Sequence, residues 1–198
     1  MDREQAQRLR QGVRQAYSAV AEQPADTHPF PVGREFAASL GYPAALLADV
    51  PAVAVAAFSG VANVAIFTTI PAGATVLDLG CGAGLDALLA ARRAGPSGRI
   101  VGIDFSAAML ARGHQAITEA RVNNIAFVRA DAERLPLARG SIDIAMVNGI
   151  FNLNPARQAI FRELARVVRW GGAVYAAELV LRAPLPPEMQ ASATNWFA

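Results

Sequence analysis

Val76-Leu77-Asp78-Leu79-Gly80-Cys81-Gly82-Ala83-Gly84 is an apolar run followed by a glycine-rich segment, and it is the strongest local signal in this chain. The apolar run at its start predicts a buried strand over Thr75 to Leu79, and its glycines predict a tight turn. The apolar segment from Leu85 to Ala94 predicts a helix that Gly95 ends. Glycines let the backbone approach a ligand closely, and the following helix presents free N–H groups to an anionic group. The stretch therefore predicts a ligand-binding turn between a strand and a helix.

Downstream of this turn, short β-rich runs alternate with longer helical ones, which is typical of a parallel α/β sheet. Four more strands are expected, at Arg99 to Ile103, Ile125 to Arg129, Ile142 to Val147 and Ala173 to Val180. Two more helices are expected, one capped by Ser106 and running to about Arg121, the other capped by Asn154 and starting at Pro155. The second of these has an apolar face that extends to Val168, and Gly171-Gly172 leads from it into the last strand. We predict a doubly wound, mostly parallel sheet over residues 71–198, with its ligands at the carboxyl ends of the strands.

Residues 1–70 have a different pattern, without strands. Helices are expected at about Arg3 to Ala21, Val32 to Leu47 and Ala52 to Phe67, with a Pro-rich stretch after the first. We predict that this region is an N-terminal helical lid over the domain of residues 71–198.

The composition excludes several classes of protein. With 198 residues, 54% hydrophobic and 17% charged, the chain is expected to fold around one packed core. All 18 basic residues are arginines, scattered against 16 acidic residues, so no nucleic-acid partner is expected. The uncharged run from Pro51 to Ile70 contains serine, asparagine and threonine, which favours buried helix and loop over a membrane span.

The single cysteine, Cys81, allows neither an intrachain disulfide nor a cysteine-cluster metal site. We therefore expect no metal and a reducing, cytoplasmic setting. The charged N-terminus has no apolar segment of the kind that secretory signals carry, in agreement with that location.

Polar residues follow three of the expected strands. Asp104 closes the second, where a carboxylate can accept both hydroxyls of a ribose; Asp131 follows the third, placed to accept from an adenine amino group; Asn148 follows the fourth. Each alone could be a cap, a turn residue or a loop amide. Together with G-x-G-x-G spacing, in place of the G-x-G-x-x-G of dinucleotide sites, they favour S-adenosylmethionine over a nicotinamide cofactor, which remains the weaker alternative.

With these motifs, residues 74–181 resemble the class I S-adenosylmethionine-dependent methyltransferase domain, in the branch of the arsenite and quinone C-methyltransferases. The resemblance implies S-adenosylmethionine as cofactor. It implies contacts to the methionine part from Asp78, Gly80, Cys81, Gly82 and Gly84, to the ribose from Asp104, and to the adenine from Asp131 and Ala132. Phe105 and Met109 would flank the adenine or simply pack the sheet, and Asn148 would lie where donor and acceptor meet.

The likeness to arsenite methyltransferases does not extend to their substrate ligands. Those enzymes hold trivalent arsenic on cysteines, because soft thiolates suit that ion. This chain has Val61 and Gly149 where two of these cysteines would stand, and Cys81 in the glycine turn is no substitute. We therefore expect a small, apolar acceptor held under the lid.

Methyl transfer needs positioning and exclusion of water more than acid–base groups. If the acceptor must lose a proton, the candidate bases are Tyr17, His28 and Glu178, and Asn148 is a further catalytic candidate because of its position near the transferred methyl group. Tyr17 could instead touch the cofactor, and His28 could be a plain loop residue. The alternative to an enzyme is a degenerate module that binds S-adenosylmethionine without an acceptor pocket.

The family normally adds an antiparallel hairpin after the fifth strand. The prolines at 184, 186 and 187 argue against a central strand there, so we expect this C-terminal hairpin to be absent. The chain would then be a fragment, or a homodimer would cover the open edge.

Overall fold

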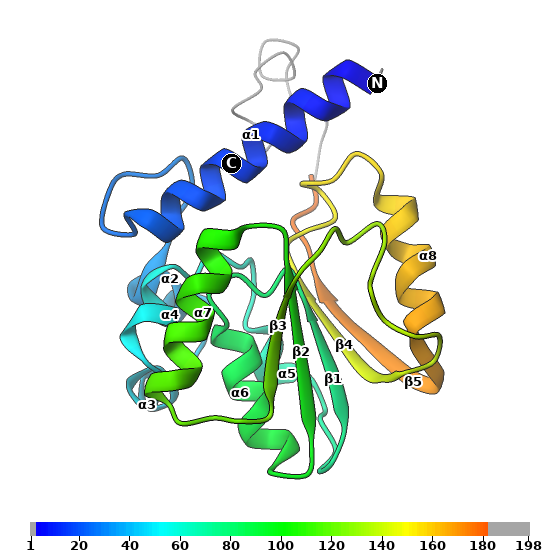
Figure 1. Ribbon diagram of the computed structural model, residues 1–198. Helices are drawn as coiled ribbons and strands as arrows, with labels where there is room; N and C mark the ends of the chain where they lie inside the picture. Colours follow the sequence, from blue (N-terminus) through cyan, green and yellow to red (C-terminus); the bar gives the residue numbers. More distant parts are fainter. Residues whose placement is uncertain (1–2, 182–198) are drawn as a thin grey trace.

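The computed structural model describes residues 3–181, whose centre is a five-stranded parallel sheet in the order β3-β2-β1-β4-β5 (Figure 1). The strands are β1 (Thr75–Leu79), β2 (Arg99–Asp104), β3 (Ile125–Arg129), β4 (Ile142–Asn148) and β5 (Val168–Ala177). Every pairing is parallel. β1 is central, and its last four residues are buried because helices cover both faces of the sheet. The predicted α/β sheet is confirmed.

Helices pack on both faces of this sheet. On one face α5 (Val64–Phe67), α6 (Leu85–Ala94) and α7 (Ala107–Glu119) share a core with Val76 of β1. On the other face α8 (Arg157–Val167) packs with Leu77 and Leu79. Because alternate residues of a strand point to opposite faces, one apolar strand supplies both cores. The sheet is therefore doubly wound, as predicted.

The N-terminal region is helical, but its second and third expected helices are each divided in two. The structure has α1 (Arg3–Glu22), α2 (Gly33–Ser39), α3 (Ala44–Asp49) and α4 (Ala52–Ala56) ahead of α5. Gly41, at a φ of +89°, turns the chain between α2 and α3. The segment between α4 and α5 is not helical, and the side chain of Asn148 forms hydrogen bonds with the backbone of Val61 and Ala62 there. The first break therefore follows a local turn at Gly41, whereas the second is held by long-range bonds from Asn148.

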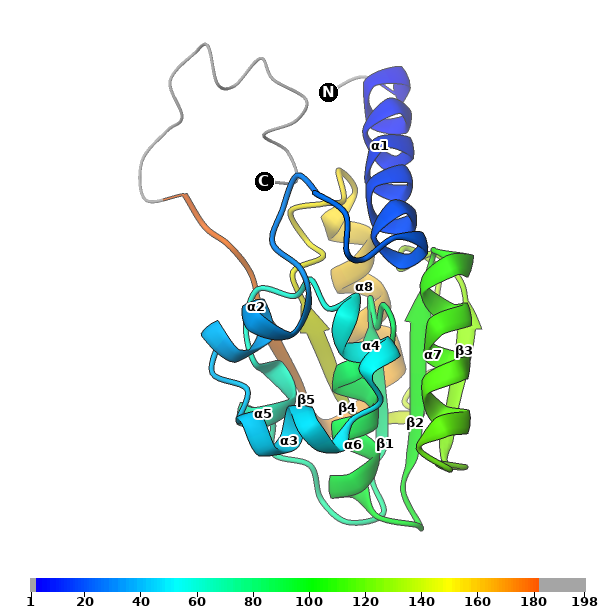
Figure 2. The same ribbon diagram turned by 90° about the vertical axis from the view of Figure 1, so that its left-hand side faces the viewer.

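Helix α1 stands apart from the other N-terminal helices. Helices α2 to α5 pack beside the sheet and share the core of α6, whereas α1 lies across the carboxyl ends of the strands (Figures 1 and 2). Val20 and Ala21 of α1 pack on Met109 of α7. Only α1 is thus arranged as a cover over the edge of the sheet where ligands are expected.

The fifth strand differs from its prediction at both ends. It begins at Val168, where the helical pattern was expected to continue, and it ends at Ala177 and not at Val180. Its pairing with β4 is irregular between Ile142 and Ile144, and a Cβ on Gly172 would lie 2.6 Å from the carbonyl oxygen of Asp143. Gly171 and Gly172 were expected in a turn before the strand. They lie inside it, where the backbones of β4 and β5 approach closely.

β5 is an edge strand with apolar side chains in solvent. Trp170 is fully exposed and Val174 is 44% exposed. The expected absence of a C-terminal hairpin concerns residues outside the described range, and the homodimer stays a prediction. Between residues 3 and 181, no helix is both long and apolar enough to cross a membrane.

Candidate active site

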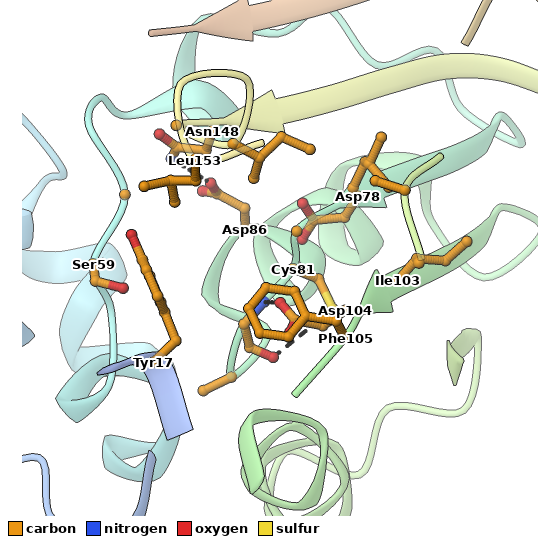
Figure 3. Close-up of a pocket in the computed structure, with 18 of the residues that line it drawn as sticks. Tyr17, Ser59, Asp78, Cys81, Asp86, Ile103, Asp104, Phe105, Asn148 and Leu153 are labelled. Carbon is orange, nitrogen blue, oxygen red and sulfur yellow. Dashed lines mark hydrogen bonds between the residues drawn. The ribbon is translucent and has the colours of Figure 1, made fainter. Parts of the chain in front are cut away.

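A pocket lies at the carboxyl ends of the strands, where β1 and β4 are neighbours. The chain leaves β1 towards β2 and β3 and then returns on the other side to form β4, and such a reversal opens a crevice between the two strand ends. The pocket is lined from α1, from the turn after β1 and from the ends of β2, β3 and β4 (Figure 3). The predicted cofactor residues among its lining are Asp78, Gly80, Cys81, Gly82, Asp104, Phe105, Asp131, Ala132 and Asn148.

The glycine turn forms one wall of the pocket. Gly80 has a φ of +78°, and a Cβ there would lie 2.4 Å from Cγ2 of Ile150, which lines the same pocket. The backbone N–H groups of Gly80 and Cys81 both donate to the carbonyl oxygen of Ile103, at 2.8 and 3.1 Å. These bonds hold the turn against the end of β2, and position 80 requires glycine because its φ is positive and a Cβ would collide with Ile150.

Asp104, at the end of β2, is fixed by backbone donors. Its Oδ2 accepts from the N–H of Gly82 at 2.9 Å and its Oδ1 from the N–H of Ser106 at 2.8 Å. The side chain is buried, and burial raises its pKa despite these bonds. Each carboxylate oxygen has a second lone pair, so both can accept a further hydroxyl. The carboxylate is thus pre-oriented towards the cavity.

Two more carboxylates face the same pocket (Figure 3). Asp78 is the penultimate residue of β1, and its Oδ2 is fully covered and has no hydrogen-bond partner in residues 3–181. Asp86 comes from the first turn of α6, where an acidic residue is common because it suits the helix dipole. Because that ordinary explanation was sufficient, sequence reasoning did not assign Asp86 to the site.

The amide of Asn148 has its hydrogen bonds filled by protein groups. Its Oδ1 accepts from the N–H groups of Val61 at 2.8 Å and Ala62 at 3.2 Å. Its Nδ2 donates to the carbonyl of Ala62 at 2.8 Å and to Oδ2 of Asp86 at 3.0 Å. Tyr42 completes the network by donating its hydroxyl to Oδ1 of Asp86 at 2.5 Å. Asn148 therefore holds the segment between α4 and α5 as a wall of the pocket.

Helix α1 is tied to the pocket by one face. Arg10, Arg14 and Tyr17 all line the pocket, and their spacing of four and three residues places them on the same side of the helix. Arg10 pairs with Asp131, 3.5 Å away, and with Glu133, while the guanidinium of Arg14 lies 5.8 Å from the centre of the Phe105 ring. The two arginines, which sequence reasoning missed, join α1 to the turns after β2 and β3.

Tyr17 points its hydroxyl into the cavity (Figure 3). Its ring stacks on Phe30 with 4.8 Å between centroids. Burial, and then the negative charges of Asp104 and Glu178, raise the pKa of this phenol above its ordinary value. Tyr17 is therefore neutral near pH 7 and offers an aromatic surface and a hydroxyl, not a base.

Four predicted site residues are not part of the pocket lining. His28 bonds to the carbonyl of Gln23 at 2.9 Å, and Glu178 accepts from the N–H groups of Phe151 at 2.7 Å and Asn152 at 3.2 Å. Met109 is buried below the glycine turn, and Gly84 caps α6 against the ring of Phe127. Their roles stay predictions, and these positions suit support of the surrounding loops.

Replacement of His28 with alanine tests its assignment as a base. Since its ring bonds within its own loop and lies outside the pocket, we expect the variant to bind the pocket's ligand and to turn it over within about twofold of the parent, as surface substitutions usually do. Steady-state kinetics and calorimetric titration measure this. A loss of turnover of tenfold or more with unchanged binding would return His28 to the list of bases.

Comparisons with known proteins agree with this geometry. Residues 70–197 match the family model described as a methyltransferase domain. The chain is 36% identical over 131 residues to an arsenite methyltransferase of Halobacterium salinarum, covering 66% of this chain and 34% of that protein. It is 33% identical over 106 residues to a demethylmenaquinone methyltransferase of Lactococcus lactis, covering 54% of this chain and 42% of that protein.

A solved structure shows the same fold. The arsenic(III) S-adenosylmethionine methyltransferase of Chlamydomonas reinhardtii superposes with a TM-score of 0.60 at 24% identity, over 85% of this chain and 58% of that one. The chain thus spans between a third and three fifths of the length of these relatives. Because the family model covers more than half of its residues, the chain belongs to the methyltransferase-domain family.

Proposed function

We propose that this chain binds S-adenosylmethionine in the pocket between β1 and β4 and transfers its methyl group to a small, uncharged acceptor held beneath α1. The observation that carries the proposal is the pairing of an open glycine turn with three buried carboxylates, Asp78, Asp86 and Asp104, in one pocket. A ligand with a ribose and two positive groups complements such a site.

S-adenosylmethionine is the cofactor of this family, and the residues present fit it. Asp104 offers two oriented acceptors for ribose hydroxyls, and Asp78 offers an unpartnered oxygen for an ammonium group. Asp131 and Ala132 line the end of the pocket beyond β3, where we assign the adenine. Gly80 and Gly82 line the pocket without side chains, so a ligand can approach the backbone of the turn.

The chemistry of methyl transfer makes modest demands on this chain. Bound S-adenosylmethionine would supply a methyl group activated by its sulfonium and would leave as S-adenosylhomocysteine, and an acceptor with an O–H or S–H bond would lose that proton to solvent. Tyr17, Ser59 and Leu153 line the side of the pocket that we assign to the acceptor (Figure 3). The ring of Tyr17 would stabilise positive charge and help exclude water, which favours in-line displacement.

The acceptor is proposed to be uncharged and not arsenite. The carboxylates disfavour an anion, and the 198 residues contain one thiol, Cys81, which is buried and has a raised pKa. Trivalent arsenic binds best to several thiolates, which this pocket does not offer. A lone buried thiol also suits the reducing cytoplasm, where we place the protein.

Calorimetric titration of the purified chain with S-adenosylmethionine, S-adenosylhomocysteine and NAD tests the cofactor. We expect the first two to bind with micromolar affinity and NAD not to bind. Binding of NAD alone, or of none of the three, would contradict the proposal.

Transfer of a radiolabelled methyl group to a panel of phenols, quinols and thiols tests the reaction, with arsenite as the comparison. Turnover of any uncharged member above arsenite supports an enzyme. Tight cofactor binding without turnover across the panel would favour the binding module, because the hydrogen bonds of Asn148 and Glu178 are already used within the protein.

A further inference from the structure

In the part of the chain that the structure describes, the pocket gathers three carboxyls that form no ion pair with a basic side chain. Asp78, Asp86 and Asp104 are 2%, 6% and 8% exposed and line the same cavity. The charged groups that act on Asp78 are Asp86 and Asp104, both of its own sign. Ionising all three carboxyls together is therefore unfavourable, because burial and like charge both oppose it.

Within residues 3–181, the groups from other elements that face Asp78, Asp86 and Asp104 do not neutralise the charge of these carboxyls. Tyr42, from the turn between α2 and α3, donates to Asp86, and Cys81 and Tyr17 are neutral groups with raised pKa values. Glu178, past the end of β5, adds negative charge near Tyr17. Arg10 and Arg14, the two arginines of the pocket lining, act elsewhere, on Asp131 with Glu133 and on Phe105.

The two neighbouring carboxyls differ in their hydrogen bonds. Asp86 accepts from the hydroxyl of Tyr42 and the amide of Asn148, and both bonds favour its charged form. Asp78 accepts one bond, from the backbone of Ala87, and leaves Oδ2 without a partner in residues 3–181; burial raises its pKa well above the ordinary value, with Asp86 and Asp104 adding to the effect. A proton shared by the two carboxyls therefore lies mainly on Asp78, because hydrogen bonds stabilise the charged form of Asp78 less than that of Asp86.

We infer that the ligand-free pocket holds one proton on the Asp78–Asp86 pair, and that a cationic ligand releases it to solvent on binding. The carboxyl O–H bond breaks, the electron pair stays on oxygen, and the resulting carboxylate pairs with the ligand's ammonium group. The inference rests on the proposed function, since S-adenosylmethionine is the cationic ligand.

The sign of the pH dependence follows from this exchange. Below the pKa of the pair in the free protein, the ligand must displace the proton, so the affinity falls by up to tenfold for each pH unit. Above that pKa the pair is already ionised, and the affinity no longer depends on it. Acid therefore weakens binding of a cationic ligand but not of a neutral one.

Titration calorimetry in buffers of different ionisation enthalpy measures the released proton directly. At about pH 6.5 the ligand's own amino group, with an α-amino pKa of about 7.7–8.0, stays protonated and does not contribute. We expect S-adenosylmethionine to release close to one proton. The matched ligand is 5′-deoxy-5′-methylthioadenosine, which has the same adenosine but no amino-acid part and no charge, and we expect it to release none.

Variants assign the proton to its site. Asp78→Asn is expected to abolish the release, whereas Asp26→Asn, on an exposed loop, is expected to retain it. If Asp78→Asn does not fold, the contrast between the two ligands on the unmodified protein decides. Binding of S-adenosylmethionine without proton release overturns the inference alone, as does release that persists in both Asp78→Asn and Asp86→Asn. Failure of both ligands to bind would instead overturn the proposed function.

Discussion

Asp104→Ala is expected to weaken the binding of S-adenosylmethionine about 100-fold. Hydrogen bonds to a charged group contribute roughly 1.5–3 kcal/mol each, so the loss of two ribose contacts costs about 3 kcal/mol, or two powers of ten in the dissociation constant. The variant also removes the acceptor for the N–H groups of Gly82 and Ser106, which loosens the glycine turn. Calorimetric titration measures the loss.

Two controls separate a ligand contact from a damaged turn. Asp26→Ala removes an exposed carboxylate and should bind with the parent's affinity. Asp104→Asn retains an oxygen acceptor but lacks the second, so it should also bind more weakly than the parent while melting closer to it than Asp104→Ala does. Parent-like affinity in Asp104→Ala, with an unchanged melting temperature, would show that the ribose is not held here.

Asn148→Ala is expected to lower the free energy of unfolding by about 2–3 kcal/mol. The truncation leaves the N–H groups of Val61 and Ala62, and one oxygen of Asp86, without their partner. Unsatisfied buried groups cost about 1–3 kcal/mol each, and access to the pocket lets water recover part of this. Urea unfolding followed by circular dichroism measures the change.

The matched control is Asn123→Ala, an exposed asparagine in the turn before β3, which should change stability by less than about 0.5 kcal/mol. Asn148→Asp provides a second test, because it retains the shape and one acceptor but sets a carboxylate against Asp86. Its destabilisation should grow as the pH rises and the two acids ionise. Equal stability of Asn148→Ala and the parent would mean that the amide does not hold the segment between α4 and α5.

Much of the sheet could be predicted because its signals are local. β1, α6 and β3 begin and end where the apolar runs meet glycines or polar turns, and their predicted bounds are confirmed. The positions of Asp104 and Asp131 followed from the parallel order, since strand ends in such a sheet meet at one edge. Both residues line the pocket.

The sequence predicted two elements wrongly, the end of α8 and the helix around Val61, because both depend on contacts with residues far away in the chain. The end of α8 was expected to include Val168, because a β-branched residue continues an apolar helical face as readily as it starts a strand. The pairing with Ile142 of β4 makes it a strand. Likewise, the helix expected from Ala52 to Phe67 is interrupted around Val61, where the backbone is bound by a side chain 87 residues away.

The parallel α/β sheet, the glycine turn and the acids at the ends of β2 and β3 could be predicted from the sequence, because each depends on neighbours within a few residues. The roles of Asp86, Asn148, Arg10 and Arg14 emerge only in the folded chain. Asp86 bonds to residues 44 and 62 positions away, and Arg10 reaches the turn after β3 from the first helix. Such contacts depend on how separate elements pack together, and no local pattern of residue types encodes that packing.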